Sequence, residues 1–328
     1  MFKKILRIKF ALVTTILILL ISGINFAIVY LFVPGSLKEE KTIIIKSKLS
    51  IEQMTSILYE NKIIKLPALF TILAKIYSLK HLLKSGEYTF TQNISPIQTL
   101  RILAHGKSIV HKLIIPEGVM VSEIIKKIND EERLMGEILG AVPEGFLMPS
   151  TYYYSYGDQK EQIINKMRKL MTAAIDKAVQ KLPTDSPLKT RLDVLILASI
   201  VEKETNLDSE KPLVAAVFLN RLKKQMKLQA DPTTIYAITL GQGKLGRMLT
   251  KRDLALPSPY NTYYVFNLPP GAISCPGAKS IESVVNPANV DFLYFVVNSN
   301  GGHNFASNIS EHNKNVDSYR NSVNNIKK

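Results

Sequence analysis

Two glutamates, Glu202 and Glu204, end an apolar segment that starts at Leu197. A helix turns by about 100° per residue, which places Glu204 on the face that carries Ile200 and Val201 and points Glu202 roughly the opposite way. Burial at the rim of a core removes water from a carboxyl group and raises its pKa. A carboxylic acid that is protonated near neutral pH can donate a proton to a leaving group. From this segment alone a second interpretation stays open, in which both glutamates are solvated residues in the last turn of a buried helix.

Aromatic, amide and carboxylate side chains gather downstream of this segment. Tyrosine rings stack on the CH groups of sugars and amides pair with sugar hydroxyls, so this composition suits a cleft that binds a sugar polymer. Each motif alone is also compatible with a capped turn, with Asp231 as a helix cap and Arg221 as the structural partner of an acid. The candidates for substrate contact or support are Glu202, Asn220, Arg221, Gln229, Asp231, Tyr260, Asn261, Thr262 and Tyr263.

Other catalytic chemistries lack their motifs. The five histidines are scattered and show no H-E-x-x-H spacing, so the sequence predicts no metal site and no cofactor, and His303 is interpreted as structural. No G-x-S-x-G motif marks a serine nucleophile. The single cysteine, Cys275, excludes an intrachain disulfide.

The charge balance favours an anionic partner. The 328 residues include 42 Lys and Arg against 27 Asp and Glu, a formal net charge of +15. No block of basic residues and no aromatic-basic stripe concentrates this charge, so a nucleic acid is not predicted as the partner. The pattern instead indicates general attraction to a negatively charged surface or polymer.

The N-terminal region has the pattern of a membrane anchor. No charged residue occurs between Phe10 and Leu37, and the 23 mostly apolar residues 11–33 would span about 35 Å as a helix, enough for a hydrocarbon core of about 30 Å. A cleaved signal peptide is the alternative, but no clear small-x-small cleavage site follows. Four basic residues precede the apolar run: Lys3, Lys4, Arg7 and Lys9. Their positive charge predicts that the N-terminus lies in the cytoplasm and the rest of the chain on the far side of the membrane.

Residues 42–115 are predicted to form a small α+β module. A capping-box pattern begins at Ser50, and Ser95 followed by Pro96 marks a second helix start that Gly106 would end. The predicted strands are 42–46, 87–90 and 110–115, and the predicted helices are 50–60, 67–83 and 95–106.

Residues 116–328 are predicted to form a second, larger α+β region. Its expected helices are 161–182, 192–205 and 212–223, and its expected strand is 292–298. After residue 223 the composition shifts toward Gly, Pro, Asn and Tyr, which is typical of loops that carry binding sites.

Ten short motifs in one order resemble the membrane-anchored endolytic murein transglycosylases, the MltG or YceG-like family. The resemblance covers essentially the whole chain. Ser150 departs from it, because an acid usually follows the Phe-Leu-x-Pro turn there. The matching positions are 86–90, 116–118, 144–146, 198–205, 217–221, 228–232, 260–263, 268–271, 276–277 and 302–303.

This resemblance implies an α+β architecture with five parts. Residues 1–9 would be cytoplasmic, 10–33 a single transmembrane helix in the inner (cytoplasmic) membrane and 34–41 a linker. Residues 42–115 would form a LysM-like module and 116–328 the catalytic domain, on the periplasmic or outer side. The implied partners are the membrane, the glycan strands of peptidoglycan and, as candidates, cell-wall synthases.

The resemblance also implies an activity, the cleavage of the MurNAc–GlcNAc β-1,4 bond within nascent glycan strands. The product would carry a 1,6-anhydro-MurNAc end, and cleavage would terminate glycan elongation. The catalytic acid would be the second glutamate of the Glu-Lys-Glu-Thr motif, Glu204, in agreement with the helical-face argument. Two alternatives stay open: an inactive peptidoglycan-binding scaffold, and a muramidase-type hydrolase that uses Glu204 and Asp231 as a carboxylate pair.

Overall fold

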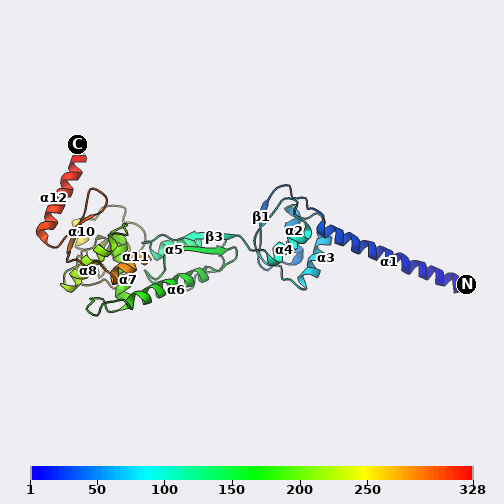
Figure 1. Ribbon diagram of the computed structural model, residues 1–328, viewed down its shortest axis with the longest axis horizontal. Coiled ribbons are helices and arrows are strands. Elements are labelled where there is room, and N and C mark those ends of the chain that lie inside the picture. Colours follow the sequence, from blue (N-terminus) through cyan, green and yellow to red (C-terminus); the bar gives the residue numbers. More distant parts are fainter. Residues whose placement is uncertain (1, 327–328) are drawn as a thin grey trace. The chain divides into compact units, whose positions relative to one another are not determined.

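The structure, a computed structural model, describes residues 2–326 and mixes helices with short antiparallel strands (Figure 1). Residue 1 of the predicted cytoplasmic segment and residues 327–328 of the predicted catalytic domain lie outside the described residues. The chain divides into two compact units. One comprises residues 1–111 with 153–158, and the other comprises residues 112–152 with 159–328.

The first unit begins with the long apolar helix α1, Phe2–Phe32. Within residues 2–326 it is the one helix long and apolar enough to cross a membrane. Its side chains are exposed along nearly the whole length, with Tyr30 as the buried exception. Because helical hydrogen bonding continues through the basic residues before the apolar run, α1 starts earlier than the predicted span at residue 10.

A small α+β module follows α1 in the same unit. Strands β1 (Lys41–Ile45) and β2 (Gly86–Phe90) pair antiparallel, with Ile43 opposite Tyr88. Both predicted capping boxes are confirmed, at Ser50 and Ser95. The helices are α2 (Ile51–Glu60), α3 (Pro67–Ser78) and α4 (Pro96–His105), so α3 ends five residues before the predicted end at residue 83.

The division between the units falls within a second pair of strands. Strand β3 covers Val110–Ile114 and pairs with β4, Thr151–Ser155, across a long insertion that contains helix α5, Val121–Asn129. Side chains of β4 alternate between exposed and buried positions, as expected for a strand with one face on a core.

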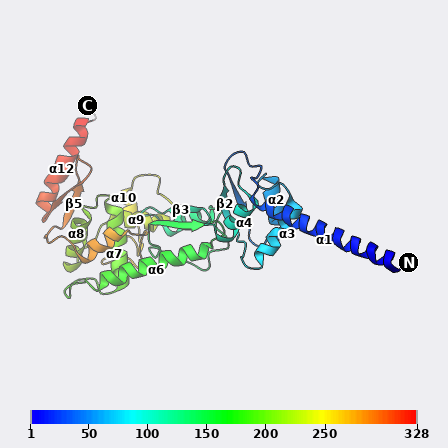
Figure 2. The same cartoon turned by 45° about the vertical axis from the view of Figure 1, so that its right-hand side comes forward.

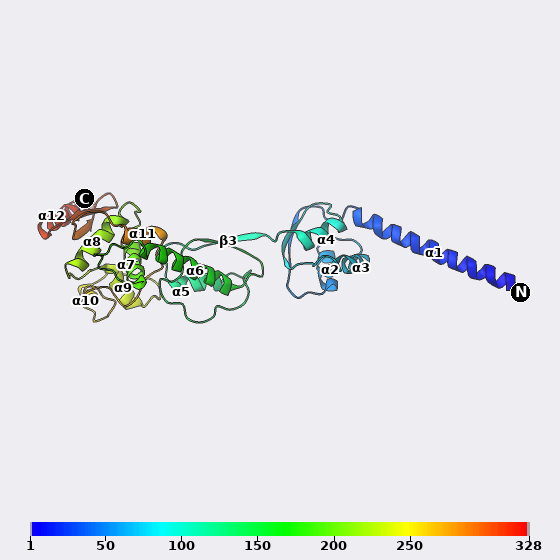
Figure 3. The ribbon, with the colours of Figure 1, turned by 60° about the horizontal axis from the view of Figure 1, so that its bottom comes forward.

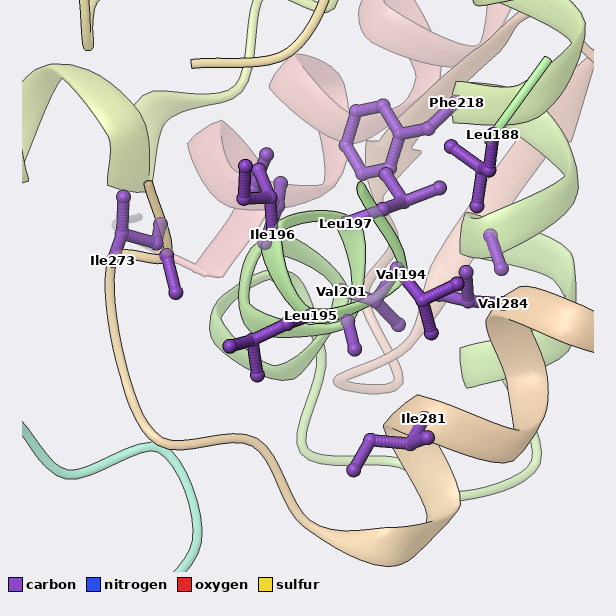
Figure 4. Close-up of a cluster of buried hydrophobic side chains, with 14 of the residues drawn as sticks. Leu188, Val194, Leu195, Ile196, Leu197, Val201, Phe218, Ile273, Ile281 and Val284 are labelled. Atoms are coloured by element: carbon purple, nitrogen blue, oxygen red, sulfur yellow. The ribbon is translucent and has the colours of Figure 1, made fainter. Parts of the chain in front are cut away.

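Helix α7, Arg191–Glu204, is the central element of the second unit. It packs against α6 (Lys160–Val179), α8 (Lys211–Lys223) and α11 (Ala278–Val285). Figure 4 shows apolar side chains of α7 pointing in several directions, together with Phe218 of α8 and with Ile281 and Val284 of α11. Residues 194–202 of α7 are all buried, so this helix is apolar all round rather than along one stripe. The predicted helices at 161–182, 192–205 and 212–223 are confirmed, with ends shifted by at most three residues.

The remaining elements of the second unit follow α8 in the chain. They include α9 (Asp231–Thr239), the short α10 (Lys251–Leu254) and the antiparallel strands β5 (Tyr294–Val297) and β6 (His303–Ala306). The C-terminal helix α12, Ile309–Ile326, packs on both of these strands (Figure 2). Strand β5 is shorter than the predicted strand at 292–298.

Candidate active site

A cavity of about 270 Å³ opens where α7 ends. It brings together the end of α7, the last turn of α8, the first residue of α9 and the strands β5 and β6 of the second unit. The lining residues are Glu204, Arg221, Leu228, Gln229, Asp231, Tyr263, Phe295, Val296, Val297 and His303. Sequence reasoning had named five of these ten, and the fold brings those five together.

Glu204 is the last residue of α7 and is partly buried at this cavity. Loss of water around its carboxyl group raises its pKa to about 8, and the neighbouring negative charge of Asp231 adds to the rise. The positive charge of Arg221 opposes it and does not cancel it. The predicted rise in pKa is confirmed, so the side chain is mainly a neutral carboxylic acid at neutral pH.

Arg221 forms hydrogen bonds with several backbone segments of the cavity wall. Its Nε donates to the carbonyl oxygen of Leu293 at 2.7 Å, and its Nη1 donates to the carbonyl oxygen of Leu228 at 2.9 Å and to Oε1 of Gln229 at 3.3 Å. The guanidinium also lies 5.2 Å from the ring centre of Tyr294. Arg221 thus links the turn before α9 to β5 through carbonyl groups rather than through an acid, while it keeps a positive charge beside Glu204.

Asp231 and Tyr263 form a hydrogen-bonded pair on the cavity wall. The Tyr263 hydroxyl donates to Oδ1 of Asp231 at 2.6 Å, and burial together with this bond raises the pKa of Tyr263. Gln229, two residues before Asp231, has a left-handed backbone with φ of 51°, which is unusual for a residue with a side chain. The strained turn therefore sets the directions of both Gln229 and Asp231.

His303 lines the cavity although it was interpreted as structural. Its Nδ1 lies 2.7 Å from Oε2 of Glu210, and its backbone N–H donates to Oε1 of the same carboxylate at 2.7 Å. A side chain on Gly302 would bring a Cβ within 2.5 Å of that Oε1. The Gly302–His303 motif was visible in the sequence, but its partner Glu210 lies 93 residues away, which no local signal reports.

Glu202 does not reach the cavity and instead anchors α7. Its carboxylate accepts hydrogen bonds from the backbone N–H of Gly277 at 2.9 Å and from the hydroxyl of Ser280 at 2.6 Å, and it pairs with Nζ of Lys211 at 3.3 Å. These partners tie the last turn of α7 to α8 and α11. Glu202 therefore positions the helix that carries Glu204. The two glutamates lie in different surroundings, and only Glu204 lines the cavity.

Asn220 and Tyr260, both candidates for substrate contact, lie outside the lining of the cavity. The Asn220 amide donates to the carbonyl oxygens of Val290 and Phe292 at 2.9 and 3.0 Å, which fixes the segment leading into β5. The Tyr260 ring packs on Tyr236 with ring centres 4.8 Å apart. Both side chains are committed to internal contacts.

Asn261 and Thr262 are fully buried and also lie outside the cavity lining. The Asn261 amide donates to the carbonyl oxygen of Leu256 at 2.8 Å and accepts from the Thr234 hydroxyl at 2.8 Å. The Thr262 hydroxyl pairs with that of Thr233 at 2.8 Å. Buried polar groups that are satisfied in this way fix a loop in place, so these two residues support Tyr263 and α9 from behind.

The assembled groups suit the transfer of a proton to a bound sugar polymer. One carboxylic acid is protonated at neutral pH, and the surrounding amide, phenol, carboxylate and guanidinium groups can bind hydroxyls and carbonyls. In the part of the chain that the structure describes, no three His, Cys, Asp or Glu side chains are grouped as metal ligands.

Comparison with known proteins identifies the family of the chain. The model of the YceG-like family matches residues 43–318. The chain therefore belongs to the YceG-like family.

Two relatives carry the name endolytic murein transglycosylase. The Bacillus subtilis protein is 29% identical, over 88% of each chain, and the Streptococcus pneumoniae strain D39 protein is 28% identical, over 87% of this chain and 59% of its own length. A crystal structure of a putative YceG-like protein from Listeria monocytogenes is also similar, with 30% identity and a TM-score of 0.54. The match covers 84% of this chain and 98% of that one.

Proposed function

We propose that this protein is an endolytic transglycosylase of peptidoglycan, with Glu204 as its catalytic acid. The observation that carries the proposal is the raised pKa of Glu204, about 8, in a cavity lined by groups that bind sugars. Family membership and the names of the relatives support the same activity. The substrate would be a nascent glycan strand cut at its MurNAc–GlcNAc β-1,4 bonds, and the cut would end elongation.

One acid is enough for this reaction. Glu204 donates its proton to the glycosidic oxygen as the bond from C1 of MurNAc to that oxygen breaks. The C6 hydroxyl of the same MurNAc attacks C1 and gives its proton to the Glu204 carboxylate, which restores the acid. The products are a free GlcNAc hydroxyl and a 1,6-anhydro-MurNAc end, with no water consumed. Attack from within the sugar gains from proximity.

The other lining groups would hold the strand against Glu204. Gln229 and Tyr263 offer an amide and a phenol to sugar hydroxyls and N-acetyl groups, and Arg221 would stabilise the Glu204 carboxylate that forms after proton donation. Burial is the main cause of the raised pKa of Glu204, and the negative charge of Asp231 adds to it, so the acid form is favoured between turnovers. In this proposal Asn220, Tyr260, Asn261 and Thr262 support the cavity rather than contact the glycan.

The proposal includes the place of the enzyme at the membrane. Helix α1 would be an uncleaved single-pass anchor in the cytoplasmic membrane, with the basic N-terminus inside the cell. Residues 42–115 would be a LysM-like module, and residues 116–328 the catalytic domain on the outer side. The length and exposure of α1 support the anchor.

Mass spectrometry of digested glycan tests the reaction. Purified full-length protein in detergent is incubated with peptidoglycan, and new chain ends are identified by mass. Anhydro-MurNAc ends are expected, because the internal C6 hydroxyl replaces water. Binding of glycan without any new ends would contradict the proposal and indicate a scaffold.

A hydrolase with two carboxylates is the second candidate, because Asp231 lines the same cavity as Glu204 and affects its pKa. Such an enzyme uses one carboxyl group as acid and the other as base or nucleophile. Its products would carry reducing ends, 18 mass units heavier than the anhydro ends because one water is added. The same mass spectrum therefore separates the two reactions.

The activity should depend on pH through Glu204. The acid form acts, so activity is expected to stay level below pH 8 and to fall as pH rises through about 8. Asp231→Asn removes the negative charge that helps to raise this pKa, so the falling limb should move to lower pH. Initial rates from pH 5 to 9.5 measure both curves. An unmoved limb in the variant would show that Asp231 does not act on Glu204 electrostatically.

A further inference from the structure

Helix α3 carries an apolar face that nothing within the first unit covers. Ile72 and Ile76 of α3 and the C-cap residue Leu79 are 57, 60 and 84% exposed and follow the i, i+4, i+7 spacing of one helix face. Leu82, just beyond the helix, is 77% exposed. The opposite face packs into the module core through Phe70. Because α3 is apolar on both faces, we expect the exposed face to contact a second apolar environment.

The surroundings of this face are strongly basic. Between residues 61 and 86 there is no acidic residue and there are five lysines. One of them, Lys75, pairs with Glu52 of α2 across 2.5 Å, and both side chains are more than half exposed. Lysines that flank exposed apolar side chains extend to the headgroup level when a helix lies on a lipid surface. They are Lys62, Lys65, Lys75, Lys80 and Lys84.

The segment that leads into α3 lies next to the end of the apolar helix α1 in the same unit. Tyr30 of α1 is buried in the module core, and its hydroxyl accepts a hydrogen bond from the N–H of Leu66, the residue before α3, at 3.2 Å. Lys65 Nζ donates to the carbonyl oxygen of Pro34 at 3.4 Å. Figures 1, 2 and 3 all show α3 at the end of the module from which α1 leaves.

An apolar cavity of about 260 Å³ marks the same junction. Its wall combines α1 side chains with the segment that leads into α3. The lining residues include Phe26, Val29, Val33, Ile64 and Leu66. A cavity with almost wholly apolar walls at the end of a spanning helix offers space for a lipid chain.

We propose that the outer face of α3 docks on the membrane surface and that the lipids it prefers are anionic. The exposed row Ile72, Ile76 and Leu79 enters the boundary between headgroups and acyl chains, and the lysines contact headgroup phosphates. The module is thereby fixed on the bilayer beside its own anchor. This inference rests on the proposed spanning role of α1 and is independent of the proposed reaction.

A single tryptophan tests the docking, because the protein contains none of its own. Leu79→Trp is made in the full-length chain, which is reconstituted into vesicles containing phosphatidylglycerol and brominated lipids. Val110→Trp, at a residue of β3 that is 57% exposed, is the matched control. Interfacial helices insert about 5–10 Å, so lipids brominated near the headgroup should quench the Leu79→Trp emission at least about twofold more than the control.

Further measurements vary the charge of the lipids and check that the protein is anchored and active. Quenching of Leu79→Trp is expected to weaken in vesicles of phosphatidylcholine alone and after Lys80→Glu with Lys84→Glu. Resistance to carbonate extraction establishes that α1 spans the bilayer, and release of anhydro ends establishes activity. Equal quenching at both tryptophans in an anchored, active protein would overturn the proposal. Protection of Leu79→Trp from acrylamide by soluble glycan chains, in detergent without lipid, would also overturn it and assign the face to glycan.

Discussion

Glu204→Gln is expected to lower the rate of glycan cleavage by about 10²- to 10⁴-fold or more, because glutamine has the shape of the acid but no acidic proton. The measurement is the rate of appearance of anhydro-MurNAc ends with full-length protein at pH 6, where wild-type Glu204 is protonated. Binding to glycan should be largely retained, since the cavity wall is unchanged. Glu282→Gln, at an exposed glutamate of α11, is the control and should leave the rate unaltered.

The stability of the Glu204→Gln variant distinguishes a loss of activity caused by the missing acid from one caused by unfolding. Wild-type Glu204 stays protonated up to about pH 8 in the folded chain, whereas the unfolded side chain ionises near 4.5. Its effect on the free energy of unfolding is therefore absent below pH 4.5, and stability falls as pH rises from 4.5 to 8. Glu204→Gln removes this decline, so at pH 8 the variant should be at least as stable as the wild type. An inactive variant that is also unfolded would leave the acid unassigned, and a fully active one would place it elsewhere.

Lys211→Met is expected to destabilise the second unit by about 3 kcal/mol, the lower end of the range for a broken buried ion pair. The Lys211 side chain is 2% exposed, and its Nζ lies 3.3 Å from Oε1 of Glu202, which is 6% exposed. Removal of the ammonium leaves that carboxylate buried with only Gly277 and Ser280 as donors. Urea unfolding measured at pH 7 gives the difference in free energy of unfolding.

Two further variants identify the mechanism of this destabilisation. Lys181→Met removes an exposed partner of Glu282 at 2.8 Å and should cost less than about 1 kcal/mol. The double change Lys211→Met with Glu202→Gln removes both charges and should recover part of the loss, because no unpaired charge stays buried. A Lys211→Met protein as stable as the wild type would show that Glu202 is held by its neutral donors alone.

Local chemistry explains why much of the secondary structure was predictable. The capping boxes at Ser50 and Ser95 each depend on residues three positions apart, and their helices begin where the pattern predicts. Helix α1 and helix α7 follow from long apolar runs. The ends of α3 and β5 were less well predicted. The residues after Ser78 and those around Tyr294 have the composition of a helix and of a strand, but they lie outside the hydrogen-bonded helix and strand.

The raised pKa of Glu204 was predictable for the same reason. Its position after an apolar run predicts the end of a buried helix, where loss of water raises the pKa of an acid. The alternative of a solvated Glu204 was excluded only by the elements that form the cavity around it. The sequence by itself thus determined the candidate acid, the long apolar helix, the family and the mixed α+β character of the chain.

Only the tertiary structure decided which polar residues share the cavity with that acid. Asn261 and Tyr263 are two residues apart, yet one is buried against backbone carbonyls and the other faces the cavity. His303 joins Glu204 because the start of β6 and the end of α7 line the same cavity, across about a hundred residues of chain. Loop residues have no fixed period, so their directions depend on long-range packing and on which buried polar groups must be satisfied. For this reason the residues that line the cavity could be identified only in the folded chain.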